Sequence, residues 1–346
     1  MNFNSNFTSG AFFLLFTGAS FAMALSHLPA TTAQLETPSA EALLKGAWAP
    51  KFEDQLNKAL PVATASRNFW GGAEYAAFHD GRKGVVTGLD GWLFTSEEFS
   101  CPARYETNLA ENLAYIEKTA ARAKVAVVLI PAKARVYAAQ TGKEMPPCRK
   151  WLYDEAMSFL KLRNIEAPQL LPAMTGRDGV FLKTDTHWSP AGARIAAQEI
   201  SLLLADAGFE KHAYRTKSGD MKERAGDLTR YVPGVDFEKD KYPAFTTAEE
   251  VTVAAAGAAQ DLFGTAAPPV TLVGTSYSAN PDWHFEGFLK ESLQADVLNM
   301  ADEGQGPFTV MDAYLESTAW KENPPALIVW EIPERYLLMP HGVPPV

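Results

Sequence analysis

Residues 183–192 read KTDTHWSPAG, and this stretch determines how the middle of the chain folds. Ser189 suits the N-cap of a helix, because its hydroxyl can accept backbone amide hydrogens. Pro190 suits the first helical turn, where no amide donor is needed. The apolar run that follows predicts a helix over about 190–207.

Asp185 and His187 lie at the entrance to this predicted helix, as a carboxylate and an imidazole separated by one residue. The short segment GVFLK at 179–183 reads as a strand that leads directly into the pair. Taken alone, the pair is compatible with an ordinary loop. A chemical role requires a third residue elsewhere in the chain.

Three further apolar runs read as buried strands: VAVVLIP at 125–131, VTLVG at 270–274 and ALIVWEIP at 326–333. Continuous apolar runs suit a sheet that is covered on both faces. Helical patterns lie between the strands, at 106–123, 151–163, 190–207 and about 283–293. The alternation predicts a three-layer α/β fold with a mainly parallel sheet. The polar region 209–260 reads as an irregular insertion within it.

The strand expected at 270–274 is followed by a hydroxyl-rich turn that contains Ser276. Reactive groups collect where parallel strands end, and a sharp turn there lifts a side chain out of the sheet. A serine nucleophile needs an imidazole base and a group that orients the imidazole. Ser276, His187 and Asp185 supply these three functions. The alternative to a catalytic role for Ser276 is that this segment is a Gly/Ser-rich turn with a purely structural role.

The composition limits the possible partners. The chain has 346 residues and a formal net charge of -10, which argues against a nucleic-acid partner. A strongly anionic polymer would require basic residues gathered locally. No second Cys or His lies at metal-ligand spacing near either cysteine, so we expect neither a metal nor a cofactor.

The N-terminal region resembles an export segment. Residues 11–26 are apolar and uncharged, and Ala22-Met23-Ala24 matches a cleavage signal after Ala24. No Lys or Arg precedes Lys45, so an uncleaved anchor is the alternative to a cleaved signal. We expect residues 1–24 to be a signal peptide or signal-anchor and 25–65 to be a linker and N-terminal extension. The catalytic domain then spans residues 66–346. We expect it to lie in the periplasm, where the N-terminal segment could anchor it to the inner membrane.

An even cysteine pair in an exported protein predicts a disulfide between Cys101 and Cys148.

Several motifs in one order resemble the alginate O-acetylation proteins of the AlgJ/AlgX type. They are DTHWS at 185–189, GTSYSANP at 274–281, DGWLF at 90–94, IPAKARVY at 130–137, GDL at 226–228 and WEIPERYL at 330–337. The resemblance covers about residues 70–340 and implies an SGNH-hydrolase-like domain. In it the Asp-x-His element precedes the Ser element, a circularly permuted order relative to most SGNH hydrolases.

The resemblance implies that Ser276 is the nucleophile, His187 its base and Asp185 the group that orients His187. The candidate substrate-binding side chains are Trp188, Tyr277, Arg335 and Tyr336. The chain ends at Val346, soon after the last motif, which matches the AlgJ-type layout without a C-terminal carbohydrate-binding module.

The implied function is an O-acetyltransferase that modifies an exopolysaccharide such as alginate through a serine acyl-enzyme. The implied partners are the polysaccharide acceptor and a membrane-bound O-acyltransferase that supplies acetyl groups. Two alternatives remain open: a carbohydrate O-acetyl esterase with the same three residues, and a non-catalytic polysaccharide-binding subunit of a secretion complex.

Overall fold

The computed structural model describes most of the chain from residue 84 onward. The described ranges are 84–205, 208, 211–232, 240–254 and 268–342, with 17–18, 21–29, 32–33, 35, 37, 39 and 48–60 near the N-terminus. The chain divides into two compact units, Met1–His79 and Asp80–Val346. The first unit contains helix α3 (Ala49–Ala59). Among these residues, no helix is both long enough and apolar enough to cross a bilayer. Most of the predicted export segment 1–24 lies outside the described residues, so it stays a prediction.

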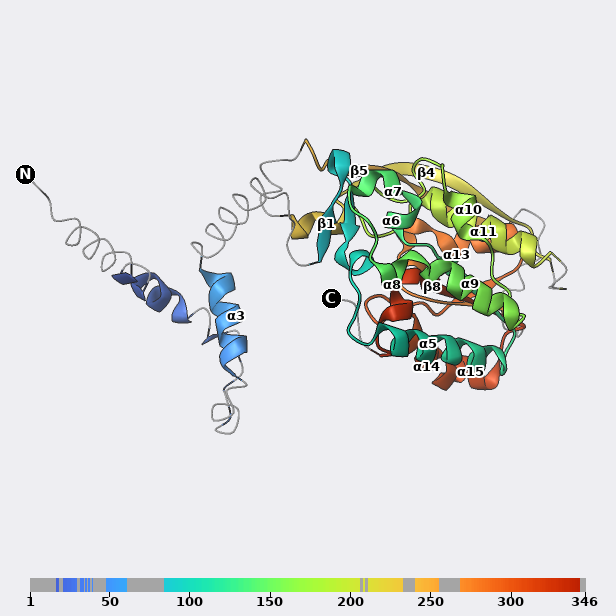
Figure 1. Cartoon of the computed structure of the whole chain (residues 1–346), viewed down its shortest axis with the longest axis horizontal. Coiled ribbons are helices and arrows are strands. Elements are labelled where there is room, and N and C mark those ends of the chain that lie inside the picture. The colour runs from blue at the N-terminus through green and yellow to red at the C-terminus, as the bar shows by residue number, and fades with distance from the viewer. Residues whose placement is uncertain are drawn as a thin grey trace, which may run out of the picture. The chain divides into compact units, whose positions relative to one another are not determined.

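A four-stranded parallel sheet forms the centre of the second unit (Figure 1). Its strand order is β3 (Val125–Ile130), β8 (Leu327–Pro333), β6 (Val270–Val273) and β7 (Val297–Asn299). Every residue of β3, β6 and β8 is buried. Alternate side chains of β3 belong to two different hydrophobic clusters, because successive residues of a strand point to opposite faces. The sheet therefore lies between two apolar layers.

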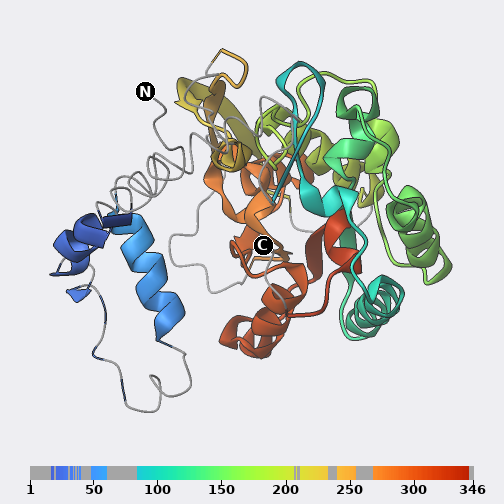
Figure 2. The same ribbon diagram turned by 60° about the vertical axis from the view of Figure 1, so that its left-hand side comes forward.

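Helices supply both of those layers, as Figures 1 and 2 show. One hydrophobic cluster includes residues of α10 (Leu170–Met174), α11 (Pro190–Leu203) and α13 (Phe285–Leu293). The other includes residues of α5 (Tyr105–Ala120), α9 (Leu152–Leu162) and α14 (Pro307–Glu316). The second unit is thus a three-layer α/β domain, as the sequence predicts.

Shorter elements complete the unit. The strands β1 (Val85–Thr87) and β2 (Leu93–Thr95) pair antiparallel. The short helices are α6 (Lys133–Val136), α7 (Ala138–Thr141), α8 (Pro147–Lys150), α12 (Ser276–Ala279) and α15 (Thr318–Glu322). The 3-10 turns are η1 (Leu89–Gly91), η2 (Ser96–Phe99), η3 (Asp227–Tyr231), η5 (Pro281–Trp283) and η6 (Glu334–Leu338).

The predicted strand at 179–183 is wrong. Residues 179–183 form no strand of the sheet; they make a single bridge, between Phe181 and Trp188. The segment folds back on the turn that follows it, since Leu182 N donates to His187 O at 3.2 Å and Ser189 N donates to Val180 O at 3.0 Å. The three other predicted strands and the four predicted helices are confirmed as β3, β6, β8, α5, α9, α11 and α13.

The prediction of an irregular insertion at 209–260 is wrong for the described residues of this region, 211–232 and 240–254. It contains a two-stranded antiparallel ribbon of β4 (Tyr214–Arg224) and β5 (Phe245–Ala254), with a register shift between Ser218 and Met221. Most residues of β4 are exposed, so the strand carries little of the apolar alternation that marks a half-buried strand. The polar composition concealed a regular element.

The predicted disulfide between Cys101 and Cys148 is confirmed, with 6.0 Å between the two Cα atoms. It connects the segment that follows η2 to helix α8 across a sequence separation of 47 residues. Among the described residues there is no free cysteine. The bond closes a loop that contains α5 and β3.

Replacing both cysteines by serine is expected to lower the free energy of unfolding by about 4 kcal/mol, because the unfolded chain loses a loop restraint. Urea unfolding of the oxidised protein and the double variant measures the difference. Thiol labelling of denatured, unreduced protein is the companion measurement. Two free thiols per chain would contradict the bond.

Candidate active site

The carboxyl edge of the sheet brings together residues from distant parts of the sequence. Ser276 follows β6, Lys133 follows β3, and the η6 turn follows β8. The turn before α11, which carries Asp185 and His187, reaches the same edge. This is where parallel α/β sheets place reactive groups.

Asp185, His187 and Ser276 form one chain of hydrogen bonds. His187 Nδ1 lies 2.7 Å from Asp185 Oδ1, and His187 Nε2 lies 2.7 Å from Ser276 Oγ. The backbone amide of His187 also donates to Asp185 Oδ1, at 2.9 Å. The two loops that the sequence places 89 residues apart therefore meet. The order acid, imidazole and hydroxyl allows the imidazole to take the serine proton while the carboxylate stabilises the resulting cation.

A buried carboxylate holds the turn that presents Ser276. Glu331 of β8 accepts hydrogen bonds from Thr275 N at 2.6 Å and from Ser278 Oγ at 3.0 Å. Gly274 is required at this turn, because a Cβ there would lie 2.5 Å from Glu331 Oε2. Burial raises the pKa of Glu331 to about 7, although the donors from Thr275 and Ser278 oppose the rise. The side chain of Glu331 therefore connects the turn that presents Ser276 to the central strand β8.

A second carboxyl group, that of Asp227, lies next to Asp185. The amide of Asp227 donates to Asp185 Oδ2 at 2.9 Å, and Asp227 Oδ1 accepts from Thr186 N at 2.7 Å. Burial and the charge of Asp185 raise the pKa of Asp227. Burial would also raise the pKa of Asp185, but the hydrogen bonds from His187 outweigh it and lower that pKa. The pair thus keeps Asp185 as the ionised partner of His187.

The same three side chains also have the spacing of a possible metal site, since ligand atoms of Asp185, His187 and Asp227 lie within 4.8 Å of one another. The nitrogen and oxygen atoms of these side chains, however, already take part in hydrogen bonds within the protein. Both ring nitrogens of His187 are engaged by Asp185 and Ser276, and both carboxylates accept backbone amides. This donor set fits a proton-transfer triad better than a coordination sphere.

Aromatic rings enclose the imidazole. Trp283 stacks on His187 with 5.4 Å between ring centroids and an interplanar angle of 26°. Tyr277 lies on another side at 4.8 Å, and its hydroxyl donates to Thr186 O at 2.7 Å. The rings fix the plane of the base and limit its exposure to water.

The four predicted substrate-binding side chains are all buried, with exposed fractions of 0% for Trp188, 2% for Tyr277, 4% for Tyr336 and 6% for Arg335. Trp188 Nε1 donates to Tyr277 O at 3.0 Å, and Arg335 donates to the Tyr277 hydroxyl at 3.1 Å. These contacts give Trp188, Tyr277 and Arg335 a supporting place behind the triad. Contact of any of the four with substrate stays a prediction.

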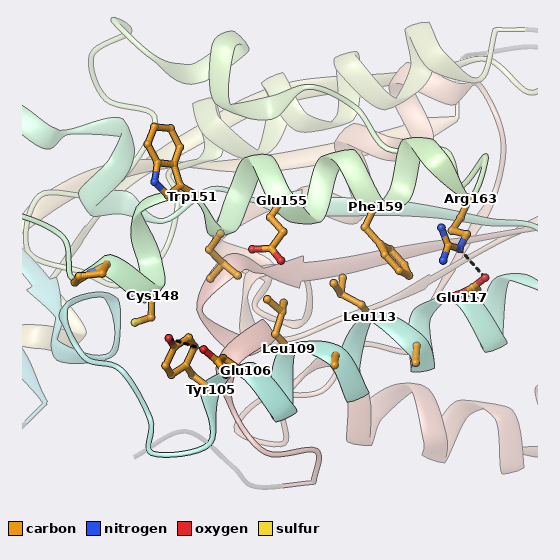
Figure 3. A pocket seen from close by; sticks show the side chains of 14 residues that line it. Tyr105, Glu106, Leu109, Leu113, Glu117, Cys148, Trp151, Glu155, Phe159 and Arg163 are labelled. Carbon is orange, nitrogen blue, oxygen red and sulfur yellow. Dashed lines mark hydrogen bonds and ion pairs between the residues drawn. The ribbon is translucent and has the colours of Figure 1, made fainter.

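A separate groove of about 700 Å³ lies between α5 and α9. Figure 3 shows Phe159 of α9 facing Leu113 of α5, with Trp151 toward the Cys148 end and the Arg163–Glu117 ion pair at the other. None of the lining residues belongs to the triad. The groove is formed by helices of the layer opposite to α11, so it is a feature distinct from the site at the sheet edge.

Residues 85–334 match a family model described as "SGNH hydrolase-like domain, acetyltransferase AlgX". The chain therefore belongs to this family of SGNH hydrolase-like acetyltransferases. The match covers both halves of the triad and confirms the family resemblance that the motifs predict.

Individual relatives place the chain within that family. The probable alginate O-acetylase AlgJ of Pseudomonas aeruginosa is 37% identical over 337 residues, covering 91% of this chain and 85% of the relative. The same-named protein of Azotobacter vinelandii is 36% identical over 347 residues, covering 95% and 88%. The solved O-acetyltransferase domain of Pseudomonas putida AlgJ superposes with a TM-score of 0.68 at 38% identity, covering 75% of this chain and 93% of the other. Pseudomonas aeruginosa AlgX, at 22% identity and a TM-score of 0.56, shares the fold, with coverage of 72% and 61%.

Sequence reasoning missed several residues that shape the site, among them Trp283, Glu331 and Lys133. A signal existed for two of these three. Glu331 interrupts an otherwise apolar buried strand, and Lys133 follows another such strand within three residues. Charged residues are seldom fully buried without a specific partner, so both positions were informative. Trp283 carried no signal, because its contact with His187 depends on tertiary structure.

The pKa of Glu331 generates a stability prediction. The folded state favours the protonated carboxyl, so its contribution is complete below about pH 4.5 and is lost as pH rises toward 7. A shift from 4.5 to about 7 corresponds to about 3 kcal/mol. Glu331→Gln cannot ionise, and its free energy of unfolding should therefore fall less than that of the wild type between pH 4.5 and 7.

Urea unfolding at several pH values measures this difference. Glu155→Gln, at an exposed position on α9, is the matched control for loss of one acidic group. Parallel pH curves for the wild type and Glu331→Gln would contradict the prediction.

Proposed function

We propose that this chain is an alginate O-acetylase that transfers acetyl groups to polysaccharide hydroxyls through an acyl-enzyme on Ser276. The observation that carries the proposal is the continuous hydrogen-bonded chain from Asp185 through His187 to Ser276. The acceptor is inferred from the AlgJ relatives, whose printed names describe probable alginate O-acetylases.

The reaction has two half-reactions. His187 Nε2 takes the proton of Ser276 while Ser276 Oγ attacks the acetyl carbonyl of the donor. The tetrahedral intermediate collapses, and His187 returns the proton to the departing oxygen of the donor. A sugar hydroxyl then gives its proton to His187 and attacks the acyl-enzyme, and the proton finally returns to Ser276.

Developing negative charge on the acetyl oxygen requires nearby donors. Ser276 is the first residue of α12, where backbone amides have no carbonyl partner within the helix. We assign the Ser276 amide to the oxyanion. Asp185 remains ionised and stabilises the imidazolium that forms in each half-reaction.

The order of the motifs supports a circularly permuted SGNH arrangement. Asp185 and His187 precede Ser276 in this sequence, whereas the usual SGNH order is the reverse. We include this permutation in the proposal, together with export to the periplasm and inner-membrane association. A membrane-bound O-acyltransferase is the proposed source of acetyl groups. The apolar segment 11–26 and the Cys101–Cys148 disulfide support an exported protein.

Substitution of the triad tests the chemistry. Ser276→Ala and His187→Ala should each lower acyl-enzyme formation by roughly 10⁶-fold, and Asp185→Ala by roughly 10⁴-fold. The Ser276/His187 double variant should be no slower than either single variant, because the two act in one proton transfer. Burst release from an activated acetyl ester, normalised to folded protein, measures these rates.

Ser201→Ala on α11 is the matched control, since it removes a hydroxyl outside the triad. Mass spectrometry should locate an added acetyl group on Ser276. A full burst from Ser276→Ala would remove the serine from its role. With alginate oligosaccharides present, acetyl transfer indicates the acetyltransferase, whereas release of acetate alone indicates an esterase.

The N-terminus provides a separate prediction. If residues 1–24 are a cleaved export signal, the mature protein isolated from the periplasm should begin near Leu25. N-terminal sequencing of the exported protein decides this. An intact Met1 in the membrane fraction would instead indicate an anchor.

A further inference from the structure

Lys133 is a buried lysine at the carboxyl end of β3, with 2% of its surface exposed. Its three N–H bonds are shared among four backbone carbonyl oxygens, which enclose Nζ as a cage. The distances are 2.6 Å to Leu93 O, 2.6 Å to Leu182 O, 2.9 Å to Asp185 O and 3.1 Å to Lys183 O. Three of the four oxygens belong to the turn that carries the triad carboxylate.

These contacts favour the charged form of Lys133. Carbonyl oxygens accept hydrogen bonds and cannot donate them, and an ammonium has three protons where a neutral amine has two and a lone pair. The lone pair of a neutral Lys133 amine would have to face one of these four carbonyl oxygens, which is unfavourable. The rings of Trp92 and Phe94 lie 5.3 and 5.2 Å from Nζ and add attraction to a cation. The cage therefore holds a buried cation.

The segment before the Asp185–His187 turn is not part of the central sheet, so the Lys133 contacts add to the hydrogen bond that Leu93 N donates to Lys183 O at 3.0 Å. Residues 179–183 make only one bridge, back to Trp188, and therefore no ladder of hydrogen bonds connects them to β3. Lys133 is itself fixed at its backbone, since its amide donates to Glu98 Oε1 at 3.1 Å. The side chain thus connects the rigid end of β3 to the turn.

We propose that Lys133 is a positioning residue of the acyl-transfer site, whose ammonium fixes the Asp185–His187 turn to the end of β3. In this way His187 Nε2 is kept within reach of Ser276 Oγ. The inference rests on the proposed function of the triad. It adds a residue that touches neither substrate nor reacting atoms and acts through the turn.

The electrostatic surroundings support a pH-dependent role. Burial lowers the pKa of Lys133 to about 7, while the nearby charges of Glu98, Asp185 and Asp227 oppose that shift. The folded-state pKa lies below the usual value, so the ammonium is present at low pH and is lost as pH rises through about 7. The anchor weakens on the alkaline side.

Lys133→Met replaces the ammonium by an uncharged chain of similar length. Acylation by p-nitrophenyl acetate should fall by about 100-fold, the order of loss expected for a misplaced catalytic group. The KM for this small ester should change by less than about threefold. The ratio of wild-type to variant acylation rate should also fall as pH rises from 6 to 9, since the wild type then loses the same charge.

Two further variants separate positioning from stability. Lys133→Gln keeps two N–H donors without charge and should lose less activity than Lys133→Met. Leu160→Ala removes a buried side chain of α9 in the opposite layer and should be destabilised yet acylate at the wild-type rate. A wild-type rate in folded Lys133→Met, or a rate ratio that does not change with pH, would overturn the inference.

The outcomes also distinguish the inference from the proposed function. A wild-type protein that shows no acetyl group on Ser276 refutes the proposed function. Acetylation of the wild type with an equal rate in Lys133→Met refutes the role of Lys133 alone. If neither Lys133 variant folds, the wild type carries the test. Loss of the ammonium predicts a fall in the wild-type burst rate above pH 7, so a rate that stays level or rises from pH 7 to 9, at constant near-ultraviolet circular dichroism, then overturns the inference.

Discussion

Burial of the parallel sheet on both faces is the constraint on which the site depends. A sheet covered by α11 and α13 on one face and by α5 and α9 on the other consists mainly of apolar side chains, and polar groups gather toward the ends of its strands. At the carboxyl edge the backbone must turn, and each turn leaves amides and carbonyls that require partners. The chain supplies these partners as buried ionisable side chains.

Glu331 and Glu98 illustrate this arrangement. Glu331 accepts the amide of Thr275, and Glu98 accepts the amides of Lys133 and Ala134, at 3.1 and 2.8 Å. In each case a carboxylate of one segment fixes the first turn of another. The triad is therefore precise because its loops are held by side chains from the sheet and from η2. Helix α12, which carries Ser276, contributes little to this precision, since a four-residue helix is marginal by itself.

The sequence predicted the layers, the main strands and the triad because those features have local signals. Apolar runs mark β3, β6 and β8, and the turn motifs mark Asp185, His187 and Ser276. The prediction of a strand at 179–183 was wrong because a five-residue segment of apolar and polar residues is compatible with both a strand and a folded-back turn. The β4–β5 ribbon was not predicted because β4 is mostly exposed and polar and therefore lacks the apolar alternation of a half-buried strand. Trp283 meets His187 only through tertiary packing, which no local pattern encodes.

The disulfide has a consequence for how the segment next to η2 is held. Cys101 lies just after η2, whose Glu98 holds Lys133 and whose Glu97 pairs with Arg335 at 2.9 Å. In a reducing compartment these residues are retained by non-covalent contacts alone. After oxidation, the segment that follows η2 is tied to α8, and Lys133 lies within the covalent loop that Cys101 and Cys148 close. Reduction of the bond would therefore remove the covalent restraint next to η2 while leaving the non-covalent contacts of Glu97, Glu98 and Lys133 in place.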